Sequence, residues 1–268
     1  MAKHIFSFIF LVFFVFSCQT VPVTGRSQLA LIPNSELLPM SFQNYNEVLK
    51  ESSLSNNEEQ VAMIKRVGKR IQSAVEKYMT ENGASSQLQG FNWEFNLIKD
   101  DNTVNAWCMP GGKVAFYTGI LPICDGEDGV AIVMGHEVAH AIANHGGERM
   151  SQGLIAQLGL SSLQVALGEN PSLTNNLLLQ SVGVGTQIGM LSFSRQHESE
   201  ADRIGLIFSS MAGYDPREAP EFWKRMKAAS GGSAPPEFLS THPSNDRRIS
   251  DLNAQLPEAI KIYNNNKN

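Results

Sequence analysis

His136, Glu137 and His140 are the residues whose types and spacing most directly indicate chemistry. They lie in the middle of residues 130–145, where apolar residues point in every direction around a helical wheel and predict a buried helix. Gly146-Gly147, directly after this run, predict the end of the helix. Histidines four residues apart leave the same face of a helix, so both imidazoles can reach one point. Because unpaired polar groups are costly in a protein core, a metal ion is the simplest partner for them.

The order H-E-x-x-H on a helix is typical of zinc peptidases, in which the intervening glutamate is the general base. We therefore predict one Zn²⁺ per chain, held by His136 and His140, with Glu137 activating water. The alternative is a pair of core histidines that bond to neighbouring carbonyl groups. The helical context that the motif requires favours the metal site.

A catalytic zinc site needs a third protein ligand, and residues 194–205 supply one. Glu198 and Asp202 are four residues apart and share a helix face, and Gly205 would let this helix approach the metal helix closely. We predict Glu198 as the third ligand and Asp202 as the acceptor for the outer N–H of His136. The alternative for this stretch is a solvated helix face.

His242 follows the third ligand in the sequence. A histidine there can donate to the oxyanion of the tetrahedral intermediate, or it can cap the metal in a resting state. The alternative is a histidine on a surface loop. Arg247 and Arg248 are expected to anchor the loop that carries it. His145 and His197 lie off the ligand faces of their helices, and we assign them no role.

The elements that position these residues follow from the periodicity of apolar residues. Two helices and three strands are expected before the metal helix, at Asn34–Lys50, Asn57–Thr80, Phe91–Ile98, Thr103–Met109 and Lys113–Thr118. The strands form a small sheet directly ahead of the metal helix in the sequence. We therefore expect this sheet to lie beside the metal.

An edge strand beside the metal often pairs with the substrate backbone in zinc peptidases. The predicted edge runs from Asn105 to Cys108, with Asn105, Ala106 and Trp107 nearest the substrate. The alternative is a hairpin that only packs against the core.

The chain of 268 residues is 42% hydrophobic, which is enough for a sizeable core in one large domain or two small ones. We expect a single zinc metallopeptidase domain over residues 34–268. The chain's formal net charge of −5 and its lack of a basic stripe argue against a nucleic-acid partner. Two helices are expected at Leu154–Leu167 and Leu177–Leu191. Because residues 146–193 stand between the two halves of the metal site, we expect them to form a helical lid.

Residues 1–17 are predicted to be a lipoprotein-type signal peptide, because Lys3 precedes an apolar stretch too short to span a bilayer. Cys18 would be acylated and would tether the enzyme to a membrane by its lipid, with residues 18–33 as a linker. An ordinary signal peptide and an uncleaved anchor are the alternatives. Gln19 favours the outer membrane, so the expected location is the bacterial cell envelope, lipid-anchored and facing the periplasm.

Three cysteines occur in the chain. If Cys18 is acylated, Cys108 and Cys124 remain. In an oxidising compartment such a pair favours a disulfide, and two buried free thiols are the alternative.

Six stretches carry a resemblance to a known family: V-P-V-T-G-R (21–26), V-N-A-W-C-M-P-G-G-K (104–113), Y-T-G-I-L (117–121), G-H-E-V-A-H-A (135–141), S-R-Q-H-E-S-E-A-D-R-I-G (194–205) and T-H-P-S-N-D-R-R-I (241–249). In these stretches the chain resembles the HtpX and CAAX-prenyl-protease family of zinc metallopeptidases, in its soluble, BepA- and LoiP-like lipoprotein branch. The resemblance implies His136, His140 and Glu198 as zinc ligands and Glu137 as the base. The expected fold is α+β, a mainly helical zincin-type domain with a three-stranded sheet beside the H-E-x-x-H helix. Transmembrane helices and helical repeats of other members are not expected here.

The predicted function is a zinc-dependent metalloendopeptidase, and the resemblance implies misfolded or misassembled cell-envelope proteins as its substrates and partners. The alternative is a lipid-tethered envelope chaperone or assembly factor with a latent zinc site, although a structural site would not need Glu137. A zinc hydrolase acting on a non-peptide substrate is disfavoured, because a strand beside the metal suits an extended peptide.

Overall fold

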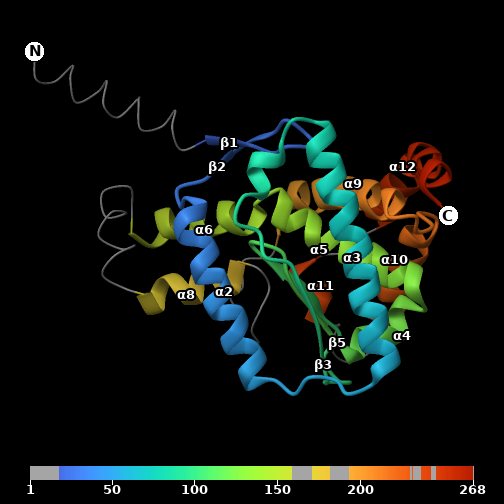
Figure 1. Cartoon of the computed structure of the whole chain (residues 1–268), viewed down its shortest axis with the longest axis horizontal. Helices are drawn as coiled ribbons and strands as arrows, with labels where there is room; N and C mark the ends of the chain where they lie inside the picture. The colour runs from blue at the N-terminus through green and yellow to red at the C-terminus, as the bar shows by residue number, and fades with distance from the viewer. Residues whose placement is uncertain are drawn as a thin grey trace, which may run out of the picture.

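The computed structural model describes residues 18–158, 171–181, 193–229, 231, 237–242 and 246–267. In chain order its elements are β1 (Cys18–Thr20), β2 (Ser27–Leu29), α2 (Asn34–Glu51), α3 (Glu58–Glu81), η1 (Ser85–Leu88), β3 (Glu94–Ile98), β4 (Ala106–Met109), β5 (Lys113–Tyr117), η2 (Thr118–Ile120), α4 (Leu121–Cys124), α5 (Glu127–Ile142), α6 (His145–Leu158), α8 (Pro171–Ser181), α9 (Arg195–Met211), α10 (Glu218–Ala229), α11 (Glu237–Thr241) and α12 (Asp246–Asn266). Figure 1 shows helices surrounding a small sheet, so the predicted mainly helical α+β class is confirmed.

The predicted buried metal helix is α5, which packs against α3, α9, α10 and β4. Its apolar residues are buried on every side, and Glu127 and Asp128 lie in its first turn, where carboxylates interact favourably with the helix dipole. The expected end of the helix at Gly146-Gly147 is wrong. The chain leaves α5 after Ile142, because Asn144 adopts the left-handed conformation with φ 53°. The two glycines lie inside α6 instead.

The three predicted strands form one sheet with the order β3-β5-β4. β3 is parallel to β5, with Glu94 opposite Lys113, and β4 is antiparallel to β5, with Ala106 opposite Phe116. β4 therefore lies at the edge of the sheet and contacts α5. This placement confirms the expected small sheet beside the metal helix.

The helices α5 and α9, which carry the predicted metal ligands, approach each other closely. A Cβ atom added at Gly205 would lie 2.7 Å from the backbone nitrogen of His136, and one added at Gly135 would lie 2.8 Å from the Gly205 carbonyl oxygen. Both distances are shorter than an ordinary van der Waals contact. Glycine at these two positions lets the backbones touch and brings the side chains of α9 to the face of α5 that carries the histidines.

Residues 18–33, which we expected to be a linker, instead form a β-hairpin that packs on the domain. β1 and β2 are antiparallel, and β2 contacts α6 (Figure 1). Val21 and Ile32 are fully buried, so burial of these apolar side chains holds the segment in place. Residues 1–17, the predicted signal peptide, lie outside the described residues.

The expected lid, residues 146–193, is described only in part. α6 and α8 contact each other, and they overlap the starts of the two predicted helices. Residues 159–170 and 182–192 lie outside the described part of the chain, so the lid remains a prediction. None of the described helices combines the length and apolarity that a membrane span requires.

The C-terminal helices α10 and α12 pack around α5 and α9. α10 packs against both α5 and α12, and α12 packs against α9.

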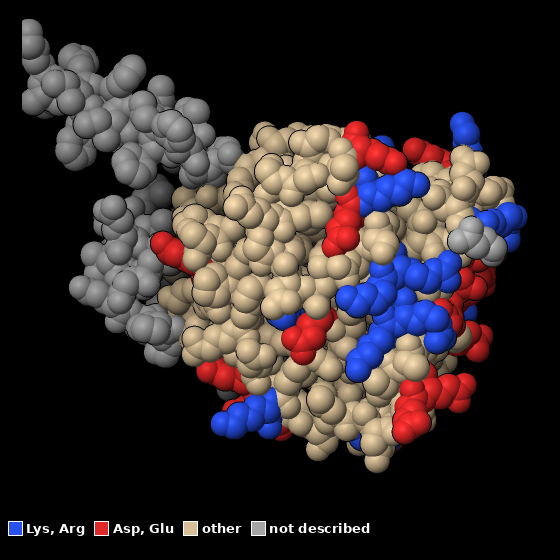
Figure 2. All heavy atoms as spheres, in the orientation of Figure 1, with Lys and Arg blue, Asp and Glu red and all other residues tan. Residues whose placement is uncertain are grey.

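Figure 2 shows that most of one face is uncharged, with Lys and Arg side chains gathered over α3. Lys65, Arg66 and Lys69 of α3 are exposed, and Arg66 forms an ion pair with Glu127.

Candidate metal centre

His136 and His140 meet one turn apart on α5. Their Nε2 atoms are 3.0 Å apart, and the two side chains are 4% and 3% exposed. The spacing of four residues in a regular helix places both rings on one face, as the sequence predicted. The two imidazole nitrogens therefore converge on one buried point.

Glu198 reaches the same point from the first turn of α9. Its Oε1 lies 3.4 Å from His140 Nε2, and its Oε2 lies 3.5 Å from His136 Nε2. Ser194 caps the start of this helix, because its side chain accepts a hydrogen bond from the backbone nitrogen of His197 and so fixes the first turn. The structure thus brings the predicted third ligand to the two histidines.

His242, in the short segment after α11, is the fourth member of this cluster. Its Nδ1 lies 3.0 Å from Glu198 Oε1 and 3.2 Å from His136 Nε2. It is 1% exposed, and its ring stacks on Phe238 with centroids 4.5 Å apart. One ligand atom from each of the four residues lies within 4.8 Å of the others. The alternative of a surface-loop histidine is therefore wrong, because the aromatic contacts bury this side chain.

The chemistry of these donors fits Zn²⁺. Two imidazoles and a carboxylate are the ligand set expected for a catalytic zinc. The Nε2 atoms of His136 and His140 face each other and the Glu198 carboxylate. One proton shared by the two nitrogens cannot provide hydrogen bonds to both nitrogen lone pairs and to the carboxylate as well. Burial lowers the pKa of His140 well below its usual value and that of His242 to about 4, which keeps both rings in the neutral form that binds metal. Zinc is the cofactor of this chain.

Glu137, the predicted base, points into the same region. It is 2% exposed, and its Oε1 has no hydrogen-bond partner among the described residues. His242 Nε2 is 3.5 Å from that oxygen. Burial and the negative charge of Glu198 outweigh the opposing positive charges of His136 and Arg248, and together they raise the pKa of Glu137 to about 8. A carboxylate in this setting has a high affinity for a proton, which is the property required of a general base.

Asp202 and Arg248 support the ligands from behind. Asp202 Oδ1 lies 3.0 Å from His136 Nδ1, the contact that the sequence predicted. Arg248 donates hydrogen bonds to both Asp202 oxygens, at 2.5 and 2.7 Å, and forms an ion pair with Glu198 Oε2 at 2.5 Å. The guanidinium is buried against the Trp223 ring at 3.6 Å. Sequence reasoning gave Arg248 only a loop-anchoring role, although its spacing of four from the buried Leu252 on α12 could have indicated an inward position.

The pKa of His136 reflects these neighbours. Burial and the Arg248 cation lower it, but the contacts with Asp202 and Glu198 outweigh them and raise it to about 9. A cation bound at Nε2 would oppose that protonation, because it would repel the second positive charge.

The predicted substrate strand lies at the sheet edge, as expected, but its side chains are buried. Asn105, Ala106 and Trp107 are at most 2% exposed, and the Asn105 side chain donates to Glu237 at 3.2 Å. Trp107 packs edge-on against Tyr45, with centroids 5.6 Å apart. Backbone pairing with a substrate remains a prediction for this strand.

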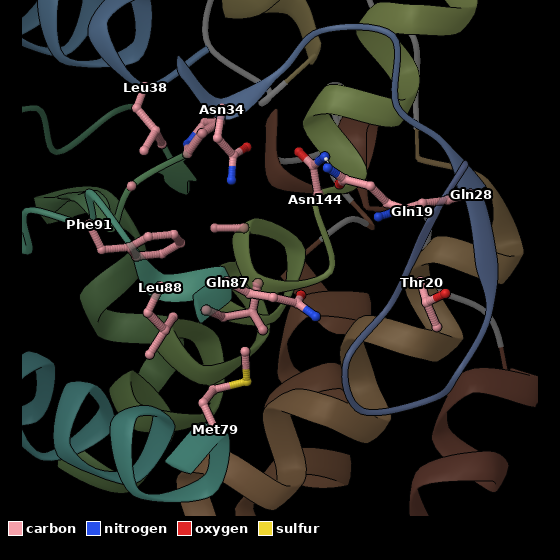
Figure 3. A pocket seen from close by; sticks show the side chains of 14 residues that line it. Gln19, Thr20, Gln28, Asn34, Leu38, Met79, Gln87, Leu88, Phe91 and Asn144 are labelled. Atoms are coloured by element: carbon pink, nitrogen blue, oxygen red, sulfur yellow. Dashed lines mark hydrogen bonds between the residues drawn. The ribbon is translucent and has the colours of Figure 1, made fainter. Parts of the chain in front are cut away.

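A cavity of about 250 Å³ lies between the N-terminal hairpin and the C-terminal end of α5 (Figure 3). It shares Pro110, Ala141 and Asn144 with a narrow crevice whose walls include Glu137 and His140. Its lining side chains are all uncharged: Gln19, Thr20, Gln28, Asn34, Leu38, Met79, Gln87, Leu88, Phe91, Pro110, Ala141, Ile142 and Asn144. The N-terminal hairpin forms one wall, where Asn144 donates to the Gln19 side chain at 3.2 Å.

Cys108 and Cys124 are both buried free thiols, so the disulfide that their pairing favoured is wrong and the alternative of two buried thiols holds. Cys108 lies on β4 near Glu137, whereas the carbonyl oxygen of Cys124, at the end of α4, accepts from Arg225. Burial raises the pKa of both thiols. The structure describes Cys18 as the first residue of β1, and its acylation remains untested.

Comparisons with known proteins agree with this geometry. Residues 65–256 match the family described as Peptidase family M48. The mitochondrial metalloendopeptidase OMA1 of Saccharomyces cerevisiae is 33% identical over 260 residues, covering 94% of this chain and 72% of the relative. Human mitochondrial OMA1 is 29% identical over 266 residues, covering 96% and 49%, and the β-barrel assembly-enhancing protease of Escherichia coli is 29% identical over 244 residues, covering 89% and 47%. The chain thus spans about half the length of the human and Escherichia coli relatives.

The expected location in the bacterial cell envelope, lipid-anchored and with the outer membrane favoured, is contradicted. Several relatives that align over most of this chain are mitochondrial metalloendopeptidases, from two yeasts and from human. A relative from Arabidopsis thaliana, 38% identical over 198 residues, is mitochondrial as well. A short apolar N-terminus followed by cysteine is a weak signal, whereas the matches to the yeast and human proteins cover 92–96% of this chain.

Proposed function

The chain belongs to peptidase family M48 and is a zinc metalloendopeptidase, and on that premise we propose that it cleaves unfolded or misassembled proteins with Glu137 as the general base. The observation that carries this proposal is the convergence of His136, His140 and Glu198 on one point with the unpartnered Glu137 oxygen beside it. A structural zinc site has no use for such a base.

His136, His140 and Glu198 would hold the metal, and Asp202 would accept the Nδ1–H of His136 and fix its tautomer. Bound zinc would polarise the scissile carbonyl and lower the pKa of a water molecule. Glu137 would take the proton of the attacking water and pass it to the leaving amine. Its raised pKa suits both halves of this transfer, because the carboxyl group must accept the proton and then release it.

We propose that His242 caps the site in a resting state. Three protein ligands and an open position make a catalytic zinc site, whereas four protein ligands close it. The Nδ1 of His242 lies at hydrogen-bond distance, 3.0 Å, from Glu198 Oε1, and Phe238 stacks on the ring and holds it there. Displacement of His242 would open the fourth position, and the displaced ring could then support the oxyanion.

The substrate that fits this site is an extended, uncharged peptide segment. β4 is an edge strand of the sheet beside α5, and a peptide can pair with such a strand. The uncharged cavity in Figure 3 would take side chains next to the scissile bond. Folded proteins rarely present an extended, unpaired segment, whereas unfolded or misassembled proteins do.

The experiment is casein degradation by the whole chain, with zinc content measured in parallel, for the wild type and Glu137→Gln. One zinc per chain in both proteins, with cleavage lost only in Glu137→Gln, would support the proposal. Substantial cleavage by Glu137→Gln would refute the mechanism. Zinc in both proteins with no cleavage by either, even after His242→Ala, would favour an assembly factor with a latent site.

A further inference from the structure

The outer nitrogens of the two metal-helix histidines are supported in different ways. His136 Nδ1 meets Asp202 directly at 3.0 Å. His140 Nδ1 instead meets a second histidine, because His145 Nδ1 lies 2.9 Å away. His145 is completely buried, and its Nε2 lies 3.0 Å from Glu200 Oε2. Each of the two histidines is therefore connected to a carboxylate through its outer nitrogen. His136 contacts Asp202 directly, whereas the imidazole of His145 lies between His140 and Glu200.

The positions of the protons along this chain follow from Glu200. Arg26 Nε donates to Glu200 Oε2 at 2.7 Å, and Thr24 Oγ1 donates to the other oxygen. The permanent cation keeps Glu200 ionised, and an ionised carboxylate can only accept hydrogen bonds. His145 must therefore carry its proton on Nε2, which leaves its Nδ1 bare.

A bare Nδ1 on His145 determines the tautomer of His140. The 2.9 Å contact between the two Nδ1 atoms needs one proton, and only His140 can supply it. His140 then has its proton on Nδ1 and a free lone pair on Nε2, the atom that faces His136 and Glu198. The opposite tautomer of His145 would place the proton of His140 on Nε2 and block metal binding there.

We propose that Glu200, held by Arg26, is a positioning residue that sets the tautomer of the zinc ligand His140 through His145. The proposal rests on the ligand set proposed above, and it adds three residues that the sequence left without a role. Arg26 lies at the end of the turn between β1 and β2, whose backbone closes through the bond from Val21 N to Arg26 O at 2.8 Å. The N-terminal hairpin is thereby a part of the metal site, although it lies more than a hundred residues ahead of α5.

The same cluster contains a matched control. Arg26 also pairs with Glu148 at 2.8 Å, and Glu148 accepts from His197 Nε2 at 3.0 Å. The His197 ring stacks on His145, with centroids 4.5 Å apart, but this second branch reaches no nitrogen of a zinc ligand. Glu148 and Glu200 therefore share the same cation and similar burial, and only Glu200 belongs to the relay.

The test measures zinc affinity by competition with a chromogenic chelator, so it does not depend on peptidase activity. Glu200→Ala and His145→Leu should each bind zinc about 10- to 100-fold more weakly than the wild type, the usual loss when support of a ligand is removed. Glu148→Ala should bind zinc within about twofold of the wild type. Equal losses in Glu148→Ala and Glu200→Ala would overturn the relay, because they would indicate a general disturbance of the cluster.

His145→Asn makes the test specific for the tautomer. The asparagine amide oxygen can accept from His140 Nδ1 without help from Glu200, so this variant should keep near wild-type affinity. Glu200→Ala added to His145→Asn should then cause no further loss, whereas the same loss in both backgrounds would overturn the proposal.

Two further measurements keep the result unambiguous. If Glu200→Ala does not fold, Glu200→Gln replaces it. This variant should show a smaller loss of zinc affinity, because its amide oxygen still accepts from His145. Wild-type zinc affinity in both folded single variants, Glu200→Gln and His145→Leu, would overturn the relay. The cobalt-substituted protein gives an absorption spectrum of the ligand geometry, which should change in Glu200→Ala and not in Glu148→Ala. A wild type that binds no zinc would overturn the ligand set itself, whereas tight zinc binding in wild type and Glu200→Ala alike would overturn only the relay.

Discussion

Gly205→Ala tests the contact that brings the third ligand to the metal helix. The added Cβ would lie 2.7 Å from the His136 backbone nitrogen and 2.8 Å from the Gly135 carbonyl carbon, both of which are rigid backbone atoms. To reach an ordinary contact of 3.4 Å, α5 and α9 must separate by about 0.7 Å. Overpacking of this kind costs about 1–3 kcal/mol, while alanine gains about 1 kcal/mol of helix propensity over glycine.

The two effects on stability partly cancel, so zinc affinity is the more sensitive measurement. Metal–ligand distances tolerate changes of only about 0.2 Å, and Glu198 moves with α9 while both histidines stay on α5. We expect the zinc affinity of Gly205→Ala to fall at least about tenfold, with a melting temperature lower by no more than about 8 °C.

Chelator competition and thermal melting of the same samples measure both quantities. Arg203→Ala is the control, because Arg203 is an exposed residue of the same helix. Unchanged zinc affinity in Gly205→Ala would refute the reasoning, since it would mean that the helices can separate without moving the ligand. Equal losses in Gly205→Ala and Arg203→Ala would also contradict it, because the effect would then not come from the helix contact.

Three further predictions concern single side chains. Glu137→Gln should keep one zinc per chain and lose casein cleavage, because the amide cannot accept the proton of water; cleavage at wild-type rates would exclude Glu137 as the base. His242→Ala should increase peptide cleavage, because it removes the fourth donor from the site; reduced cleavage would instead identify His242 as oxyanion support alone. For Glu148, burial raises the pKa, but His197 and Arg26 outweigh burial and lower it to about 2. Its ionised form therefore adds stability above about pH 4.5 that disappears as the pH falls toward 2. The urea midpoint of the wild type should fall further between about pH 5 and about pH 3 than that of Glu148→Gln, and equal falls would contradict this account.

Local spacing was enough to predict the residues that share a helix turn. His136 and His140 converge because four residues make about one turn of a helix, and Glu198 and Asp202 share a face of α9 for the same reason. The short sheet ahead of α5 was also predictable, because its strands show their own alternation. The end of α5 was predicted wrongly, because Asn144 rather than a glycine adopts the left-handed conformation.

Contacts between distant segments could not be predicted in this way. The hairpin of residues 18–29 looked like a linker, because its strands are too short to show a period and Val21 is buried by other elements. Location was also predicted wrongly, because it rested on a short N-terminal pattern and not on the domain.

Residue spacing along the chain was enough to predict the metal and to propose the base and the ligands, since a helix converts a spacing of four into a shared face without help from the rest of the chain. The groups that contact the outer nitrogens of those proposed ligands became visible in the tertiary structure alone. Arg26, His145 and Glu200 come from three separate elements, and they meet only because the hairpin, α6 and α9 pack around one buried charge cluster. The spacing of residues along the chain does not reveal such tertiary contacts, because they depend on how the elements pack together and not on the period of any single element.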